Sequence, residues 1–192
     1  MGGVSDPRWT RLLEDGARCS SCGEIHHGIM DMGYLAPYYW QGDAARVEAS
    51  AITDHNNFLT HDLCAVDGEF YFVRCLLNLR IVDAEGQKFA YGVWASLSKQ
   101  NFQTYRDHFD NGDQGKFGPW FGWFSTKLMG YPDTLSMKCQ VHLQDERRRP
   151  HIELEPTDHP LAIEQRDGIT IQRLFDIYKV HGHDFGEARA SH

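Results

Sequence analysis

The sequence lacks the long apolar runs and the basic surface that would place it among membrane or nucleic-acid-binding proteins. No uninterrupted apolar segment approaches the length of a bilayer span, and the start MGGVSDPRW has no apolar signal-peptide centre. The chain carries 27 acidic and 19 basic residues, for a formal net charge of −8, whereas binding to phosphates needs a basic surface. We therefore expect a cytoplasmic protein with no membrane and no nucleic-acid partner.

The number of cysteines is odd, and no secretory signal accompanies them. Five cysteines among 192 residues, without a secretory signal, argue against a disulfide framework and favour reduced thiols that are free to bind metal. Internal repeats and low-complexity segments are also absent. A chain of this length and apolar content is expected to form one domain over residues 1–192, with a flexible tail over about 183–192.

Two alternating segments in the middle of the chain predict a β-hairpin. The run EFYFVRCLLNLRIV, which starts at Glu69, places apolar side chains on one face and Arg74, Asn78 and Arg80 on the other. After the turn DAEG, the run QKFAYGVWASLS alternates in the same way. Ser98 then suits the N-cap of a helix through KQNFQTYRDHF.

The second half predicts another hairpin and two helices. TLSMKCQVHL, from Thr134, is expected to pair with RPHIELE across a turn. HPLAIEQRDG predicts a helix that is capped by Thr157 or Asp158 and ended by Gly168, and TIQRLFDIYKVHG predicts a second helix. GDAARVEASAI, over 42–52, could form a short helix. We therefore expect an α+β fold in which helices flank an antiparallel sheet.

The strongest chemical motif is CSSCGEIHHG, which places Cys19 and Cys22 at metal-ligand spacing. A tight turn with a following glycine can direct both sulfurs at one ion, as in zinc knuckles. We predict such a knuckle-like loop over about 17–30. The alternatives are a pair without function and a thioredoxin-like redox pair, but the latter requires a βαβ pattern that this chain lacks.

A structural zinc site needs four ligands, so two more are required. Cys75 and Cys139 alternate with apolar residues in predicted strands and are interpreted as small core residues. Cys64, in THDLCAVDG, is therefore the preferred third thiol. For the fourth position we prefer His26, which lies nearest the knuckle; its competitors are His27, His61 and His159.

Two other clusters have both a functional and a structural interpretation. In EPTDHPLAIEQRDG, Asp158 could orient His159 as a base, with Glu153 nearby, although a helix-capping turn also explains the motif. In KFGPWFGWF, Trp120 and Trp123 could line a ligand pocket or could simply pin a loop onto the core.

A basic run, RRR at 147–149, is the third such cluster. Its guanidinium groups could clamp an anion, because the planar fork of arginine matches phosphate and carboxylate oxygens. The other interpretation is a solvated hairpin turn.

Several separated motifs together resemble a bacterial family, domain-of-unknown-function family 2199. They are CSSCGEIHHG, AP at 36–37, HDLCAVDG, GVWASLS, YPDTL, RPHIELEPTDHPLA and GIT. The resemblance extends from about Cys19 to about Tyr178. It implies no specific activity, but it implies that five residues occupy motif positions, namely Cys19, Cys22, His26, Cys64 and His159. RCLLNLRI, which has no glycine near Cys75, and the tail after Tyr178 depart from the pattern.

These observations support two main functional hypotheses. In the first, zinc is structural, and the chain is a binding or interaction module for a protein or small-molecule partner. In the second, zinc keeps an open position near His159 and serves an enzyme, most simply a hydrolase. A neutralising or regulatory partner of another protein is a third hypothesis, based on the acidic charge, the single-domain size and the lack of a decisive catalytic motif. The soft thiolates favour zinc or iron over magnesium.

Overall fold

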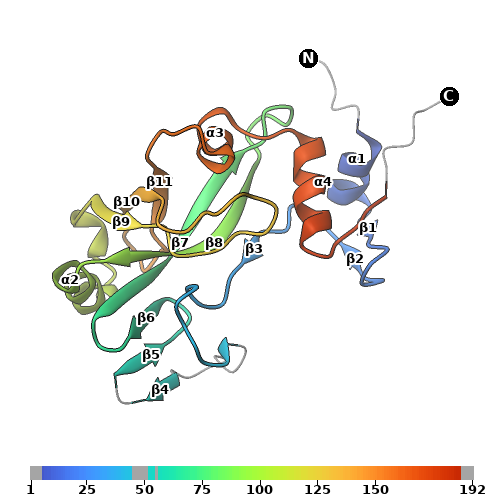
Figure 1. Ribbon diagram of the computed structural model, residues 1–192. Helices are drawn as coiled ribbons and strands as arrows, with labels where there is room; N and C mark the ends of the chain where they lie inside the picture. The colour runs from blue at the N-terminus through green and yellow to red at the C-terminus, as the bar shows by residue number, and fades with distance from the viewer. Residues whose placement is uncertain (1–5, 45–51, 55, 187–192) are drawn as a thin grey trace.

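The computed structural model describes residues 6–44, 52–54 and 56–186 and has an α+β fold (Figure 1). The helix expected over 42–52 lies largely outside these residues. The helices are α1 (Pro7–Glu14), α2 (Lys99–Phe109), α3 (Pro160–Asp167) and α4 (Ile171–Val180). The strands are β1 (Ala17–Arg18), β2 (Ile25–His26), β3 (Met32–Gly33), β4 (Ile52–Asp54), β5 (Asn57–Leu59), β6 (Leu63–Val66), β7 (Phe70–Arg80), β8 (Lys88–Leu97), β9 (Trp120–Trp123), β10 (Lys138–His142) and β11 (His151–Leu154).

The long hairpin β7–β8 organises the large sheet, and its prediction is confirmed. The two strands pair antiparallel along their length, from Tyr71 opposite Leu97 to Arg80 opposite Lys88. The other edge of β7 is shared by two strands. Its first half pairs with β6, and β11 joins it further along, where His151 lies opposite Leu76. The strand β7 thus has neighbours on both sides.

Most strand pairs of the large sheet are antiparallel, as expected, but two pairs are parallel. β11 runs parallel to β7, and β3 runs parallel to β8. The hairpin β10–β11 is antiparallel, as expected. Its parallel contact with β7 arises because the long connection from β8 to β10, which contains α2 and β9, returns the chain to the far edge of β7.

The large sheet is curved, so that the end of its edge strand β9 meets β8. Phe124, directly after β9, forms an antiparallel bridge with Ala95, and the Ser125 N–H donates to the Trp94 carbonyl oxygen at 2.8 Å. β9 also pairs with β10, so β7, β8, β9, β10 and β11 surround a common interior. A side chain at Gly122 would obstruct this closure, since an added Cβ would lie 2.5 Å from the Ser96 carbonyl oxygen.

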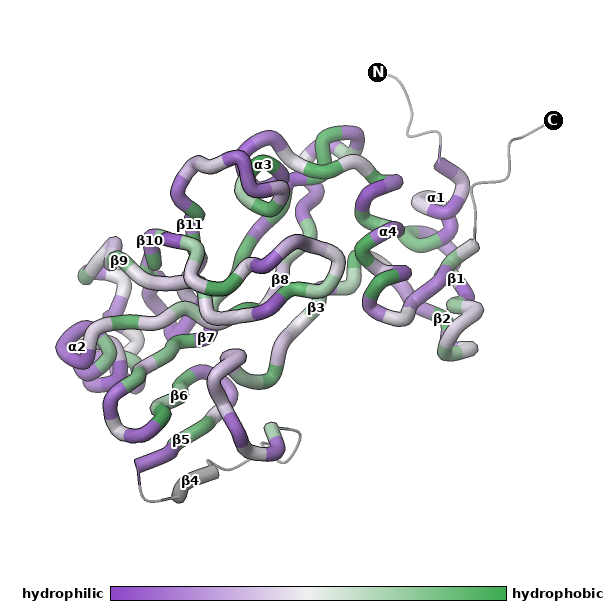
Figure 2. Tube along the Cα trace, in the orientation of Figure 1, coloured by the Kyte–Doolittle hydropathy of each residue, from purple (hydrophilic) through white to green (hydrophobic). Residues whose placement is uncertain are grey.

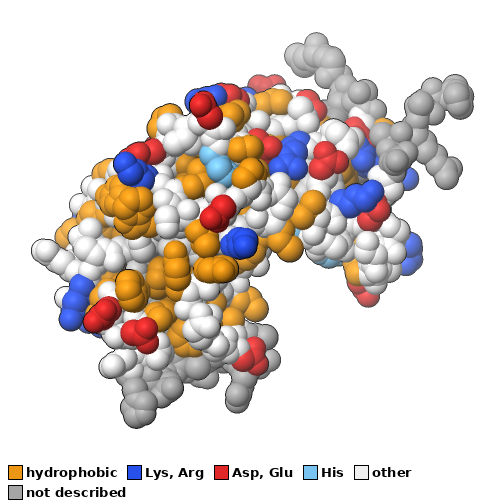
Figure 3. Space-filling view, in the orientation of Figure 1, with side chains coloured by type: hydrophobic (Ala, Val, Ile, Leu, Met, Phe, Trp, Pro, Cys, Tyr) orange, Lys and Arg blue, Asp and Glu red, His pale blue; other side chains and the backbone are white. Residues whose placement is uncertain are grey.

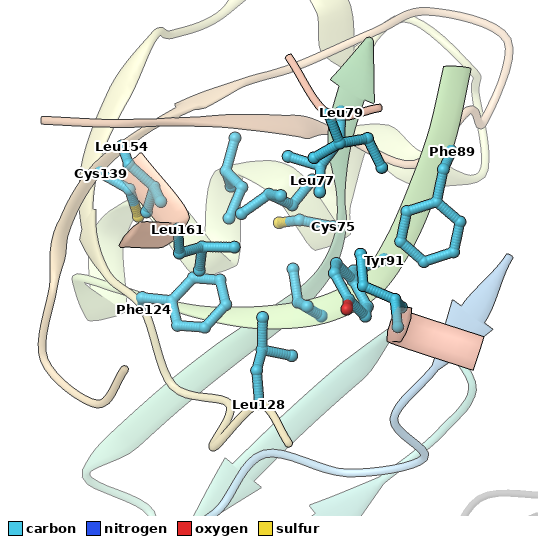
Figure 4. Close-up of a cluster of buried hydrophobic side chains, with 14 of the residues drawn as sticks. Cys75, Leu77, Leu79, Phe89, Tyr91, Phe124, Leu128, Cys139, Leu154 and Leu161 are labelled. Carbon is cyan, nitrogen blue, oxygen red and sulfur yellow. The ribbon is translucent and has the colours of Figure 1, made fainter. Parts of the chain in front are cut away.

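The main hydrophobic core fills this interior (Figure 4). Alternate residues of β7 point into it, among them Cys75, Leu77 and Leu79, each with no exposed surface. Cys139 of β10 is equally buried. Both cysteines that the sequence assigned to the core are therefore there, and burial raises the pKa of each thiol.

The segment before β10 differs from the prediction. Alternation predicts a strand from Thr134, but β10 begins only at Lys138. Thr134 is fully buried, and its hydroxyl finds its hydrogen-bond partners inside the protein. It donates to the Thr126 carbonyl oxygen at 2.7 Å and accepts from the Leu128 N–H at 3.0 Å. Ser136 has a φ of 60°, which no regular strand allows. These residues form a packed loop instead.

The helices confirm most of the predicted capping. Ser98 and Thr170 cap α2 and α4 with their hydroxyls. The helix α4 carries both hydrophobic and hydrophilic residues along its length (Figure 2). α3 is capped by His159, not by Thr157 or Asp158, because the His159 Nδ1 accepts from the Leu161 N–H at 3.1 Å. Among the described residues, none of the helices has the length and apolar character that a membrane span requires.

The helix α1 is missing from the sequence prediction, although its start carries a signal. Asp6 accepts from the Arg8 N–H and caps the helix, and Pro7 occupies the first turn. Trp9 and Leu12 are buried against the core. A helix of only eight residues gives too short a periodic signal to identify by hydrophobic pattern alone.

We predict that Gly122→Ala destabilises the protein by about 1 to 3 kcal/mol, because the methyl group forces β9 away from β8. Chemical denaturation measures the change. Gly92→Ala is the matched control, since its added Cβ meets its nearest atoms at 3.4 Å or more. Equal losses in the two variants would contradict the importance of the β8–β9 closure.

Candidate metal centre

The predicted knuckle is a two-stranded hairpin, in which β1 and β2 pair antiparallel. Between the strands, the Gly23 N–H donates to the Cys19 carbonyl oxygen at 2.9 Å and the Cys19 N–H donates to the Glu24 carbonyl oxygen at 2.8 Å. Gly23 has a φ of 79°, the left-handed conformation that glycine adopts without strain. This tight turn brings Cys19 and Cys22 onto the same side.

Two thiols and two imidazoles meet at this turn. The possible ligand atoms of Cys19, Cys22, His26 and His183 all lie within 4.8 Å of one another. The Cys22 Sγ lies 3.2 Å from the His26 Nε2. The His183 Nδ1 lies 3.9 Å from both the Cys19 Sγ and the Cys22 Sγ. The four side chains thus converge on one point.

These distances fit a tetrahedral zinc ion. With Zn–S of about 2.3 Å and Zn–N of about 2.0 to 2.1 Å, a tetrahedral site separates sulfur from nitrogen by roughly 3.6 Å. The three sulfur–nitrogen distances of 3.2, 3.9 and 3.9 Å bracket this value. The donor set, two soft thiolates and two imidazoles, also has the composition of structural zinc sites.

The turn prepares Cys19 as a thiolate. Burial of its sulfur opposes ionisation, but backbone N–H groups of Cys22 and Ser21, and then the side chains of Cys22 and His183, stabilise the charged form. Their combined effect lowers the pKa of Cys19 to about 6. The thiolate is the form that binds metal, so this environment favours coordination.

His183 reaches the knuckle because of how α4 ends. The His183 N–H donates to the Tyr178 carbonyl oxygen at 2.8 Å, and the Gly182 N–H donates to the Lys179 carbonyl oxygen at 3.1 Å. This pair of hydrogen bonds is the Schellman motif, with Gly182 at a φ of 84°. The motif reverses the chain and directs the next residues back towards the knuckle.

The segment 183–186 is held in place by neighbours from the N-terminal part of the chain. In Figure 1 this red segment passes beside β1. The Ser20 N–H donates to the Asp184 carbonyl oxygen at 2.8 Å, and the Phe185 ring lies 5.7 Å from the His26 ring. Arg8 of α1 donates to the Gly186 carbonyl oxygen at 3.2 Å. The first residues of the expected flexible tail are therefore in contact with the knuckle, while 187–192 lie outside the described residues.

Three of the four predicted ligands come together, and Cys64 does not. Cys64 lies in β6, fully buried in a second apolar cluster that contains Phe72 and Trp94. Burial raises the pKa of its thiol to about 12, so it is held as a neutral core residue. In the described part of the chain, the group of donors around Cys19 takes its fourth member from His183 instead.

The competing histidines lie elsewhere. His27 is exposed and packs over Gly16, and His61 lies in the turn before β6. His159 caps α3, and its Nε2 is buried without a hydrogen-bond partner among the described residues. None of them belongs to the four-donor group.

The candidate catalytic carboxylates do not converge on His159 or on the four donors. The Glu153 side chain is 72% exposed and faces His142, with 3.3 Å between its Oε2 and the imidazole Nε2. Asp158 is exposed at the turn before α3. His159, Asp158 and Glu153 are close in sequence, but none of them belongs to the four-donor group around Cys19.

Trp120 and Trp123 lie in different surroundings. Trp123 lines a cavity of about 970 Å³ whose aromatic walls are Tyr39, Trp40, Phe70, Phe72 and Trp123. We call this the aromatic cavity. Hydrophobic side chains gather in a band over this region between β6 and β7 (Figure 3). Trp120 instead packs against the main core, with its ring 6.4 Å from that of Phe117.

Sequence reasoning did not find His183, although a local signal exists. HGHDFG follows the helix α4 directly, and a glycine at the helix end predicts a chain reversal. A histidine immediately after that reversal is therefore directed back along the helix. What the sequence does not contain is the position of the knuckle beside that helix end.

Comparison with known proteins gives one finding. A family model described as an uncharacterized protein conserved in bacteria, DUF2199, matches residues 18–169. This match includes the knuckle and most of the sheet, but it ends before His183. No curated protein and no solved structure matches the chain. Because the match covers most of the sequence, the chain belongs to the DUF2199 family.

Proposed function

We propose that this protein binds one structural zinc ion through Cys19, Cys22, His26 and His183 and acts as a binding module. The observation that carries the proposal is the convergence of four protein donors within 4.8 Å of one another, with three sulfur–nitrogen distances close to those of a tetrahedral site. With four protein ligands, the ion has no open position for a substrate or an activated water. Zinc then has a folding role, joining the knuckle to the end of α4.

Packing around Cys19 and His26 supports a structural role, although Cys22 is exposed and both histidines are half-buried. Cys19 has no exposed surface, and the Phe185 ring packs against both His26 and Tyr178. Catalytic zinc sites are usually reached from a substrate cleft, yet two cavities formed by the described residues, of about 970 and 720 Å³, are lined by residues outside the donor group. A zinc-dependent hydrolase is the less favoured function because His159, Asp158 and Glu153 do not belong to the donor group.

The aromatic cavity is the proposed binding surface of the module. Its volume lies in the range of small-molecule sites, and its walls are mainly aromatic rings. Phe70 and Trp123 are 56% and 43% exposed, which is a large apolar surface for a protein to leave in water. Binding of a flat apolar molecule would cover these rings.

We expect protein purified without added metal to contain about one zinc per chain. Cys19→Ser and His183→Asn each remove a donor, so the zinc content should fall below about 0.2 per chain and the cooperativity of unfolding should decrease. Atomic emission and thermal denaturation measure the two effects. Cys64→Ala is the matched control and should keep the full zinc content; loss of zinc in that variant would return Cys64 to the ligand set.

We expect Gly182→Ala to weaken zinc binding severalfold and to cost about 1 to 2 kcal/mol, because a left-handed conformation strains any side chain with a Cβ. No atom would collide with the added methyl group, so the effect is purely conformational. Gly182→Asn should restore part of the loss, since asparagine tolerates this conformation better. Competition with a chromogenic chelator measures the affinity.

We expect the neutral dye N-phenyl-1-naphthylamine to fluoresce in the aromatic cavity and Trp123→Ala to weaken its binding by about fivefold, the value of one aromatic contact. Leu13→Ala is the matched control, since Leu13 on α1 has a similar exposure but does not line the cavity. A similar loss in both variants would show that the dye binds exposed apolar side chains generally and not the cavity.

A further inference from the structure

A second cavity, on the same sheet, has the opposite chemistry. It has a volume of about 720 Å³ and lies where β11 meets β7, beside the turn between β10 and β11. Its charged and titratable lining residues are Lys88, Arg147, Arg148, Arg149, His151 and Asp62. Four permanent cations thus face one carboxylate, in a chain whose net charge is −8. We call this the basic cavity.

The single carboxylate is already engaged. Asp62 pairs with Arg149, with 2.6 Å between its Oδ1 and the guanidinium Nε. Arg74 lies close enough to feel both charges: burial and then the positive charge of Arg149 lower the pKa of Arg74, and Asp62 opposes them. The Arg74 Nε is buried without a hydrogen-bond partner among the described residues. Two guanidinium groups therefore share one acid, which leaves positive charge uncompensated.

Two of the arginines are held in position by the backbone. The Arg147 Nε donates to the Asp110 carbonyl oxygen at 3.0 Å, and the Arg148 Nε donates to the Asp145 carbonyl oxygen at 3.2 Å. A carbonyl oxygen holds a guanidinium group in position but carries no full negative charge, so the positive charge of the arginine remains. The ion pair of Arg148 with Glu146 is long, at 3.7 Å, and both side chains are mostly exposed, so it contributes little.

Lys88 and His151 complete the lining from two strands. Lys88 begins β8 and is exposed. His151 stacks on His142 with 4.8 Å between ring centroids and an angle of 4°. Burial, together with the charges of His142 and Lys88, lowers the pKa of His151, although Glu153 opposes this shift. A neutral imidazole at this position can still donate one hydrogen bond.

We propose that the basic cavity binds a small polyanion, a molecule with at least two phosphate or carboxylate groups. Its volume matches small-molecule sites. Its cations come from β8 and from the β10–β11 turn, so two anionic groups of one ligand can be contacted at once. Fixed guanidinium groups lose little conformational entropy on binding and can form bidentate contacts. The proposal does not depend on zinc or on the aromatic cavity.

Isothermal titration of the zinc-loaded full chain with fructose 1,6-bisphosphate and with tricarballylate tests this proposal. Both probes bind zinc only weakly, unlike pyrophosphate or citrate. We expect at least one probe to bind with a dissociation constant below about 1 mM, and to bind more weakly as salt is added. Tighter binding of the bisphosphate would identify a phosphate ligand, and tighter binding of tricarballylate would identify a polycarboxylate.

Variants assign the binding to this cavity. Lys88→Gln should weaken binding by at least about fivefold and Lys88→Gln with Arg148→Gln by about 25-fold, since each removes a charge-assisted contact. Both positions are exposed, so folding should be preserved. Lys99→Gln, the same change at an exposed lysine in the first turn of α2, should have no effect. The proposal is wrong if neither probe binds at about 5 mM, or if Lys99→Gln weakens binding as much as Lys88→Gln.

Discussion

The pairing of β7 with three other strands is the constraint on which the structure depends. Since β8 takes one edge and β6 and β11 share the other, the two faces of β7 have fixed and different surroundings. One face, which carries Cys75, Leu77 and Leu79, closes over the main core. The opposite face carries both cavities: Phe70 and Phe72 contribute to the aromatic cavity, and Leu76 and Asn78 contribute to the basic one. A shift of one residue in register would exchange these faces.

Two proposed binding surfaces therefore lie along one strand, and their chemistry differs because different loops cover them. The aromatic cavity is closed by the segment around Trp40, and the basic cavity by the turn that carries Arg147. Arg74 lies between them, under Gly33, where an added Cβ would lie 2.8 Å from the Arg74 Nη2 and would displace the guanidinium. The sheet provides the positions, and the loops provide the specificity.

Local patterns predicted the parts of the fold that local physics determines. The hairpin β7–β8 and the caps Ser98 and Thr170 follow from alternation and from helix-end chemistry. The strand β6 was not predicted, because all four of its residues are buried and its sequence therefore shows no alternation of apolar and polar residues. This also explains the assignment of Cys64, whose segment resembles a loop in sequence but lies in the core. The parallel pairing of β11 and the closure by β9 depend on contacts between distant segments, which no local pattern records.

The end of α4 would also give the proposed zinc site a temporal order. Cys19 and His183 are 164 residues apart in the chain. During synthesis the two thiols and His26 leave the ribosome long before their fourth partner, so the complete proposed coordination sphere could form only after His183 has emerged. Once formed, zinc would close a loop that contains nearly the whole sheet, and such a cross-link lowers the entropy of the unfolded chain as a long-range disulfide does. A chain cut short before His183 would keep only three donors and an open coordination position.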